Sequence, residues 1–469
     1  MQISKKKHIV LILPRGEAIR NFILSGTAEI LKRDNEITLI SVIPTEALRQ
    51  VLEQNCNQLI EIQDIKPTYQ LGILREWIDI VHGRWLWSGA AKLRWKIRDS
   101  EAKGLKEKLS RTVKKWTAYP FVSRSGVYFL TNIENKLSQG KQTELTYFKL
   151  IKDLNPDHVF NGSHIHSKNA LPIVHAAIKL GIPTSTFLFS WDNLTSQGRI
   201  LPKYNHYIVW NQSIYNDLLK IYHHITAENV SITGTPQFDF HFKTENLWSR
   251  EEYCDRMGLS PSRPIILYTT GMLNLMPGEE VLVKNLAKII SQIPSKPQLI
   301  VRIYPKDTSG RFDKVKTELL DVKFPEIPWE KAHLTPLPED LVLWSNMLAH
   351  CEVGINVAST VTLELAMFDK PIINVGYNPT GINIAPKDYS IYYSWDHYKP
   401  IVDTGALDIA WKESEIQRQI ETYLSNPDRK KTERKGLLNT FFGDYLDGKS
   451  YVRIADTLNK IVNKYDKKA

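Results

Sequence analysis

Short apolar runs alternate with amphipathic stretches along most of this chain. The first two runs are His8–Leu13 and Glu36–Val42, and the stretches that follow them, Ala18–Arg33 and Thr45–Gln54, have helical spacing. Continuous apolar runs of this length are typical of buried parallel strands, and amphipathic stretches are typical of the helices that cover them. The pattern therefore predicts an α/β protein made of βα units.

The same pattern starts a second time near the middle of the chain. A strand over Pro264–Thr270 opens this second series, and Gln298–Tyr304, Glu352–Asn356 and Pro371–Val375 supply later strands. We expect two Rossmann-like, doubly wound domains with a junction between Asp239 and Arg263. Because open α/β sheets bind ligands outside the carboxyl ends of their strands, we expect the site in the cleft between two such domains.

The cysteines and the N-terminus limit the function classes. The three cysteines of the 469-residue chain form no CxxC pair, so neither a disulfide framework nor a zinc site is expected. The start, MQISKKKHIVLILP, has too few consecutive apolar residues for a signal peptide. No apolar run in the chain reaches the roughly 20 residues of a membrane span. We expect a cytoplasmic protein.

The positive charge is concentrated in one part of the chain. The net charge is +10. The window from Arg84 to Arg124 holds twelve Lys or Arg against three acids, and Trp85, Trp87, Trp95 and Trp116 lie among them. This window belongs to a stretch of roughly 66–140 that reads as a mostly helical insert. An anionic partner is indicated.

Three interpretations of this basic stretch stay open. Aromatic and basic residues on one helix fit a segment that lies on anionic lipid at the inner face of the membrane. They also fit single-stranded nucleic acid, but the chain has no RNA-binding signature, so we do not expect that partner. The third interpretation is a solvated helix face with the tryptophans packed inside.

The segment EVGINVASTVTLELAMFDKPIINVG (352–376) is the most informative for chemistry. Ser359 and Thr360 stand where a helix begins, and such a position favours a phosphate. Glu364 follows one turn later on the same face, where a carboxylate can accept hydrogen bonds from the two hydroxyls of a ribose. The alternative is ordinary helix capping by Ser359 or Thr360 with an acid in the first turns.

This segment resembles the nucleotide-binding half of GT-B glycosyltransferases, and equally that of the related bacterial glycerophosphotransferases and non-hydrolysing UDP-N-acetylglucosamine 2-epimerases. Further segments resemble these families in the same order and cover most of 150–380. They are SWDNLTSQG (190–198), VWNQSIYNDLLK and VSITGTPQFD within 209–239, IILYTTG (265–271) and LIVRIYPKD (299–307). The last has Tyr304 where these families commonly have His, which puts any His-dependent step there in doubt.

The resemblance implies that the two domains bind different substrates. It implies an acceptor-binding domain at 1–245, a nucleotide-sugar-binding domain at 246–440, and a C-terminal helix at 441–469 that packs back on the first domain. Thr270 and Gly271 end a strand where backbone can approach a phosphate, and Arg302 and Lys306 could neutralise a diphosphate. A plain turn and a solvated pair are the respective alternatives.

Candidate acid–base residues lie in the first half of the chain. Asp192 follows a predicted strand, and its carboxylate could act as general base on an acceptor hydroxyl, although an Asx turn explains it equally well. Glu17 at the start of the first helix and His164 in NGSHIHSKN are the second and third candidates. His164 and His166 have no third ligand in view, and no DxD pair is present, so no metal is expected.

The favoured hypothesis is a metal-independent, inverting glycosyltransferase. It would move a sugar from a nucleoside-diphosphate sugar, UDP most often, to a hydroxyl of a glycan or a lipid-linked acceptor in polysaccharide biosynthesis. A 2-epimerase or a CDP-glycerol-type glycerophosphotransferase is the alternative within enzymes. A non-catalytic protein that binds anionic lipid or nucleic acid on a transferase fold is the alternative of another class.

Overall fold

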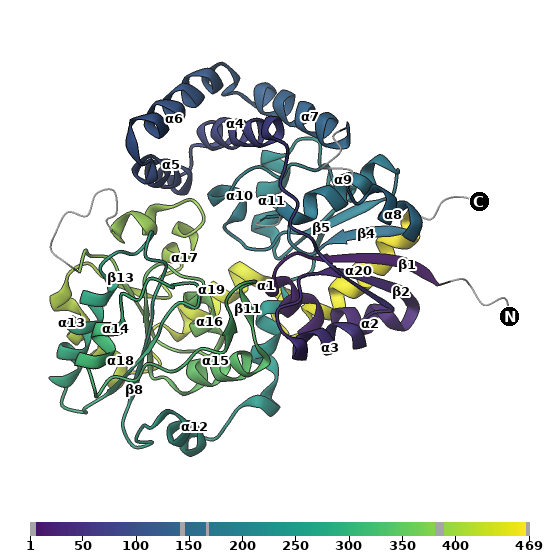
Figure 1. Ribbon diagram of the computed structural model, residues 1–469. Coiled ribbons are helices and arrows are strands. Elements are labelled where there is room, and N and C mark those ends of the chain that lie inside the picture. The colour runs from purple at the N-terminus through teal and green to yellow at the C-terminus, as the bar shows by residue number, and fades with distance from the viewer. Residues whose placement is uncertain (1–5, 141–145, 166–167, 380–388, 466–469) are drawn as a thin grey trace. The chain divides into compact units, whose positions relative to one another are not determined.

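The computed structural model describes residues 6–140, 146–165, 168–379 and 389–465, and these fall into two compact units (Figure 1). Unit 1 comprises Met1–Asp239 together with Tyr445–Ala469, and unit 2 comprises Phe240–Asp444. Cys56, Cys254 and Cys351 are all buried and free. No helix of the described residues is both long enough and apolar enough to span a membrane.

Unit 1 is built on a seven-stranded parallel sheet with the strand order β3-β2-β1-β4-β5-β6-β7. Every residue of the central strands β4, β5 and β6 is buried, as expected for parallel strands that are covered on both faces. The strands are β1 (Lys7–Leu13), β2 (Asn35–Ser41), β3 (Gln58–Glu61), β4 (His158–Asn161), β5 (Thr184–Phe187), β6 (His206–Val209) and β7 (Val230–Ile232).

Eight α-helices outside the insert accompany this sheet in the described residues. They are α1 (Gly16–Ile19), α2 (Thr27–Asp34), α3 (Glu46–Gln54), α8 (Phe148–Leu154), α9 (Leu171–Lys179), α10 (Asn193–Ser196), α11 (Gln212–Ile221) and α20 (Ser450–Lys464). The last comes from the end of the chain and packs against α2. Asp239 fixes its start, since its Oδ2 accepts a hydrogen bond of 2.9 Å from the backbone N–H of Tyr451.

The expectation of one continuous helix over Ala18–Arg33 was wrong. The stretch consists of α1, a π-helical turn over Arg20–Leu24, and α2. Gly26 has φ +99°, a left-handed conformation that ends the first part. The hydroxyl of Ser25 donates to the backbone oxygen of Asn21 at 2.6 Å, so the side chain competes with the helical ladder at this point.

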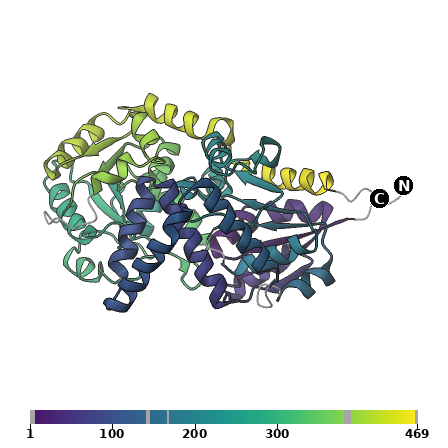
Figure 2. The same ribbon diagram turned by 90° about the horizontal axis from the view of Figure 1, so that it is seen from above.

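Four helices form the insert between β3 and α8. They are α4 (Tyr69–Leu86), α5 (Gly89–Glu101), α6 (Gly104–Ala118) and α7 (Arg124–Gly140), and they lie together as one helical group (Figures 1 and 2). A small core of their own, with Ile78, Val81, Val127 and Leu130 at its centre, holds them together. Stretch 66–140 is therefore mostly helical, as its composition predicts.

The tryptophans of the insert have different environments. Trp85 and Trp95 pack against the core of the insert, and Trp87 meets Trp95 edge to face at 5.6 Å. Trp116 on α6 is instead 76% exposed. Packing therefore explains three of the four tryptophans, and it leaves Trp116 without such an explanation.

Unit 2 is built on a five-stranded parallel sheet with the order β14-β13-β12-β8-β9 and a small antiparallel pair β10-β11. The strands are β8 (Ile265–Thr269), β9 (Gln298–Arg302), β10 (Trp329–Glu330), β11 (Thr335–Pro336), β12 (Val353–Asn356), β13 (Ile372–Val375) and β14 (Asp408–Ala410). The helices are α12 (Arg250–Met257), α13 (Glu279–Ser291), α14 (Asp313–Glu318), α15 (Pro338–His350), α16 (Val361–Met367), α17 (Lys399–Asp403), α18 (Glu413–Ser425) and α19 (Lys431–Phe442).

The expected junction between Asp239 and Arg263 contains a helix that the sequence reading missed. Helix α12 begins after Ser249, whose side chain accepts a hydrogen bond from the backbone N–H of Glu252. Ser followed three residues later by Glu is a capping-box pattern, so the signal was present in the sequence.

Candidate functional site

The strand order of unit 2 places two chain segments at one point. Strand β8 pairs with β9 on one side and with β12 on the other, so the connections after β8 and β12 leave the sheet in opposite directions. Ligands of open α/β sheets bind at this kind of switch point. Thr270 and Gly271 follow β8, and Ser359 and Thr360 follow β12, so the topology brings these four predicted residues to the same edge.

The turn between β12 and α16 is held by buried polar side chains. Oδ1 of Asn356 accepts hydrogen bonds from the backbone N–H of Ser359 at 3.2 Å and from the hydroxyl of Thr362 at 3.1 Å. The amide of Asn374 donates to the same oxygen at 3.0 Å. Ala358 has φ +38°, a strained value for a non-glycine residue that these contacts maintain. These hydrogen bonds thus fix the position of the start of α16.

Glu364 on α16 is held through one of its two oxygens. Oε1 accepts a hydrogen bond of 2.8 Å from the indole Nε1 of Trp344 and lies 3.1 Å from Nε2 of His241. Nδ1 of His241 is 2.9 Å from the hydroxyl of Ser345. When this hydroxyl donates to Nδ1, the imidazole carries its proton on Nε2, which faces Glu364. Among the described residues no donor reaches Oε2. The carboxylate is oriented but keeps one oxygen for a ligand.

Arg302 lies behind this carboxylate and is already paired. Its Nη2 donates to both oxygens of Asp340, at 2.8 and 3.0 Å, and the side chain is buried. The guanidinium stacks 4.7 Å from the ring centroid of Trp344. Trp344 therefore connects Arg302 to Glu364. A direct contact between Arg302 and a diphosphate stays a prediction.

The residues after β8 are engaged by their own chain. The Oγ1 of Thr270 accepts a hydrogen bond of 2.9 Å from the backbone N–H of Tyr304. The backbone N–H of Gly271 donates to Glu279 at 2.9 Å, and an added Cβ at Gly271 would lie 2.0 Å from Sδ of Met276, so a larger residue would displace that side chain. Lys306, the last predicted phosphate ligand, has its Nζ 5.9 Å from the ring centroid of Tyr304.

Glu279 and Arg311 are polar residues that the sequence reading did not single out. Burial raises the pKa of the Glu279 carboxyl to about 7, against the hydrogen bonds it receives. Arg311 donates to Glu279 at 2.9 Å and to the backbone oxygen of Gly271 at 2.7 Å. A Glu and an Arg 32 residues apart carry no local signal, because only the fold brings them together.

The candidate acid–base residues of unit 1 follow strand ends. Asp192 precedes α10 and accepts hydrogen bonds of 2.5 Å from the hydroxyls of Ser190 and Ser196, one on each oxygen. Nδ1 of His164, after β4, lies 3.2 Å from the backbone N of Phe189, in the segment that leads to Asp192. The fold thus brings the His164 segment next to the Asp192 segment.

Glu17 follows β1 and lies in the first turn of α1. Its carboxylate is buried and 3.1 Å from the guanidinium of Arg15. His166 lies outside the described residues. Within the described parts of the chain, no group of three His, Cys, Asp or Glu is arranged to hold a metal ion.

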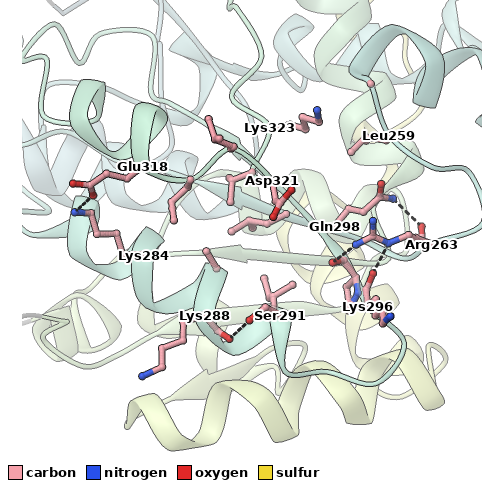
Figure 3. A pocket seen from close by; sticks show the side chains of 18 residues that line it. Leu259, Arg263, Lys284, Lys288, Ser291, Lys296, Gln298, Glu318, Asp321 and Lys323 are labelled. Carbon is pink, nitrogen blue, oxygen red and sulfur yellow. Dashed lines mark hydrogen bonds and ion pairs between the residues drawn. The ribbon is translucent and has the colours of Figure 1, made fainter.

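A cavity of about 680 Å³ lies at the opposite edge of the unit 2 sheet. Arg263 just before β8 and Gln298 at the start of β9 line it, so it opens at the amino ends of the strands (Figure 3). Lys284 contacts Glu318 there, and Arg263 donates to the backbone oxygen of Lys296 at 2.7 Å. This cavity lies at the opposite edge of the sheet from the turn that precedes Glu364.

Comparisons with known proteins support the fold. A UDP-N-acetylglucosamine 2-epimerase from Neisseria meningitidis, bound to UDP-N-acetylglucosamine, superposes with a TM-score of 0.53 at 13% identity, over 97% of this chain and 100% of that chain. A second UDP-N-acetylglucosamine 2-epimerase gives 0.54 at 14% identity, over 100% and 99%. A glycosyltransferase from Rickettsia africae gives 0.51 at 13% identity, over 99% and 100%.

No family model matches this chain, and no curated protein matches it. At these identities the likeness to solved structures concerns the fold. Two Rossmann-like α/β units with parallel sheets are what the sequence predicts, and this prediction is confirmed.

Proposed function

We propose that this chain, which has the GT-B fold, is an enzyme that binds a nucleoside-diphosphate sugar in unit 2 and transfers the sugar to an acceptor hydroxyl. The observation that carries the proposal is the setting of Glu364. It lies at the switch point of a parallel sheet, Trp344 and His241 fix one oxygen, and the other oxygen meets no protein donor among the described residues. A carboxylate in this state suits the two hydroxyls of a ribose.

Similarity in fold adds to this argument. Proteins that superpose on nearly the whole chain include a 2-epimerase solved with UDP-N-acetylglucosamine and another GT-B protein solved with UDP. UDP is therefore the first nucleotide to test. The specific sugar and acceptor are left to experiment.

The diphosphate would lie beside the turn between β12 and α16. Ser359 and Thr360 carry hydroxyls there, and Thr270 and Gly271 lie at the same edge of the sheet. Lys306 would supply positive charge for the leaving nucleotide. Arg302, which Asp340 already neutralises, would act by supporting Trp344 rather than by touching the phosphates. In this proposal no metal takes part.

The acceptor would be activated by a residue of unit 1. Asp192 is the first candidate for general base, because it is partly exposed and the hydroxyls of Ser190 and Ser196 orient both of its oxygens. It would take the proton of the acceptor hydroxyl as that oxygen attacks the anomeric carbon, which gives inversion. Glu17 and His164 are the second and third candidates.

A 2-epimerase is the second candidate function, favoured by the epimerases among the similar folds. An epimerase would act on the sugar of the bound nucleotide and need no acceptor. The two functions therefore differ in their product.

A membrane surface is the proposed location of the acceptor. Helix α6 exposes apolar side chains on one face, at positions 105, 109, 113 and 116, and Tyr119 continues the row. We call these five residues the α6 apolar face. Lys103, Lys106 and Lys108 are exposed beside it. Apolar residues flanked by lysines fit the boundary of an anionic bilayer.

The test is a calorimetric titration of the full chain with UDP, GDP, CDP and TDP, with and without magnesium. We expect one diphosphate to bind, independently of magnesium, and to bind at least about tenfold more weakly to Glu364→Ala. Glu326→Ala, an exposed glutamate of the same unit, is the matched control and should bind normally. If the folded protein binds none of the four diphosphates, the proposed function is wrong.

Product analysis separates the two candidate functions. Incubation with UDP-N-acetylglucosamine, followed by NMR of the sugar, would show a new 2-epimer for an epimerase. Release of UDP with an unchanged sugar configuration at C2 would support transfer or its hydrolytic side reaction.

A further inference from the structure

Unit 1 has a cavity of about 510 Å³ between the helical insert and the segment that follows α10. Helix α4 forms one wall, Arg98 of α5 and Arg111 of α6 reach it from the insert, and Lys168 and Gly198–Arg199 close it from the other side. A cavity of this size accommodates a small ligand or a headgroup. The same segment carries Asp192, six residues before Gly198.

Positive charge predominates in this cavity. Five cationic side chains line it, against Glu76 and Asp79. Three of the five are already paired with acids: Arg75 with Glu134, Arg98 with Asp79, and Arg111 with Asp99. Lys168 and Arg199 are the other two, and neither forms an ion pair with an Asp or Glu of the described residues.

Arg199 is the decisive residue. It is only 7% exposed, and its Nε donates a hydrogen bond of 3.0 Å to Oγ1 of Thr131. The guanidinium lies 4.6 Å from the ring centroids of both Tyr128 and Tyr222. Nη1 is buried and has no hydrogen-bond partner among the described residues. A buried charge is costly without a partner, and two aromatic faces compensate it only in part.

The positive charge of Arg199 contributes to the low pKa values of two histidines near it. Burial lowers the pKa of His82 to about 3, and the positive charges of Arg199 and Arg94 lower it further. Burial also lowers the pKa of His224 to about 4, with Lys203 and Arg199 contributing. Both imidazoles are therefore neutral near pH 7 and add no second charge. The cations of the cavity therefore outnumber its acids, five to two.

Asp79 lines the same cavity but does not form an ion pair with Arg199. It is occupied by Arg94 at 3.2 Å and by Arg98, and an added Cβ on Gly198 would lie 2.8 Å from its Oδ1. Glycine at 198 lets the segment before Arg199 approach Asp79 closely. Arg199 thus lines the cavity without an ion pair to a described acid, while Asp79 pairs with Arg94 and Arg98.

We propose that this cavity binds the phosphoryl or diphosphate group of the acceptor, with Arg199 and Lys168 as its ligands. The inference rests on the proposed transferase function and gives the acceptor its chemical class: a phosphorylated molecule, either lipid-linked or free. An oxyanion between these two cations would provide the missing partner of Arg199, since guanidinium and phosphate form strong charge-assisted hydrogen bonds.

The test is titration of the full chain with inorganic pyrophosphate while UDP is present in saturating amount, so that any diphosphate site in unit 2 is filled. We expect binding to weaken at least about tenfold in Arg199→Gln and in Lys168→Ala. Lys203→Ala removes an exposed lysine of the same unit that does not line the cavity, and it should bind pyrophosphate normally. UDP affinity and circular dichroism report whether each variant is folded.

A second titration identifies the source of the anion. Farnesyl diphosphate in detergent micelles is compared with pyrophosphate, with farnesol as the neutral control. Tighter binding of farnesyl diphosphate that is lost in the two variants supports a lipid-linked acceptor. Equal binding of the two diphosphates supports a free phosphorylated acceptor.

Two results would overturn the inference. One is a protein that binds UDP but no pyrophosphate, and the other is pyrophosphate binding that both variants retain. If the proposed function itself is wrong, none of the nucleotides binds, whether or not pyrophosphate binds at Arg199.

Discussion

The indole N–H of Trp344 donates a hydrogen bond of 2.8 Å to Glu364, across two helices of unit 2. The same indole ring lies under the guanidinium of Arg302. One tryptophan thus orients the carboxylate that we assign to the ribose and keeps an arginine in place. It is a positioning residue, and its two contacts can be separated by mutation.

Trp344→Phe removes the N–H donor and keeps an aromatic face for Arg302. Because Glu364 then has only His241 to fix it, we expect UDP to bind about tenfold more weakly, the equivalent of one hydrogen bond to a charged group. Calorimetric titration measures this. Trp411→Phe is the control, since the indole N–H of Trp411 makes no hydrogen bond to a described residue. Equal loss in both variants would contradict the assigned role.

Gly354 on β12 determines how closely α16 approaches the sheet. An added Cβ would lie 2.2 Å from the side chain of Leu365 on α16, one residue after Glu364. We expect Gly354→Ala to cost about 1–3 kcal/mol of stability and to weaken UDP binding, because α16 must shift. Thermal unfolding and titration measure the two effects.

Gly436→Ala provides the opposite case in the same unit. Gly436 lies inside α19, and an added Cβ would meet nothing within 4 Å. This variant should gain about 0.5–1 kcal/mol and bind UDP normally. Loss of stability in Gly436→Ala, or normal UDP binding in Gly354→Ala, would contradict the explanation by packing.

The α6 apolar face predicts binding to anionic vesicles. Leu109 and Trp116 are 66% and 76% exposed. We expect the double substitution Leu109→Ser and Trp116→Ser to weaken sedimentation with anionic vesicles by about tenfold or more, because it removes most of the apolar area that would enter the interface.

The control for this experiment is Leu320→Ser, an 81% exposed leucine of unit 2. It should bind vesicles as the unchanged protein does. Binding should also fall with rising salt and be weak for neutral vesicles, since the lysines beside the face contribute by charge. Unchanged sedimentation of the double variant would remove α6 as the membrane contact.

Buried histidines predict that unit 1 loses stability in mild acid. Burial lowers the pKa of His82 and His158 to about 3 and that of His175 to about 4. In the unfolded chain each imidazole takes up a proton as the pH falls through about 6.5, which the folded chain resists. The stability is complete above pH 6.5 and declines below it.

Four buried histidines set the expected size of this effect: these three and His206, whose pKa burial also lowers to about 4. Between pH 7.5 and 5.5 each costs about 1.3 kcal/mol, so the free energy of unfolding should fall by about 5 kcal/mol. Chemical denaturation at the two pH values measures it. His158→Gln should reduce the pH dependence by roughly a quarter, whereas His223→Gln, at an exposed position, should leave it unchanged. A pH-independent stability would refute this account.

The apolar pattern of the chain is sufficient to predict its α/β architecture. Apolar runs such as Ile265–Thr269 and Val353–Asn356 are buried on both faces, and a strand of that kind has no stable position outside a covered parallel sheet. The order of motifs along 150–380 then indicated the GT-B fold. Glu364, Ser359 and Thr360 were identified as a set because their spacing along one turn and one helix is local.

Tertiary structure decided which side chains surround these residues. Trp344 and His241 contact Glu364 from positions up to 123 residues away, and Arg302 contacts Trp344. No local pattern encodes these contacts. The sequence predicts Arg302 as a phosphate ligand. In the fold it pairs with Asp340, which lies 38 residues later in the chain and which no local pattern links to it. Arg199 had no signal at all, because its distinctive property is that it forms no ion pair with a described acid, and only the packed chain determines which charges pair.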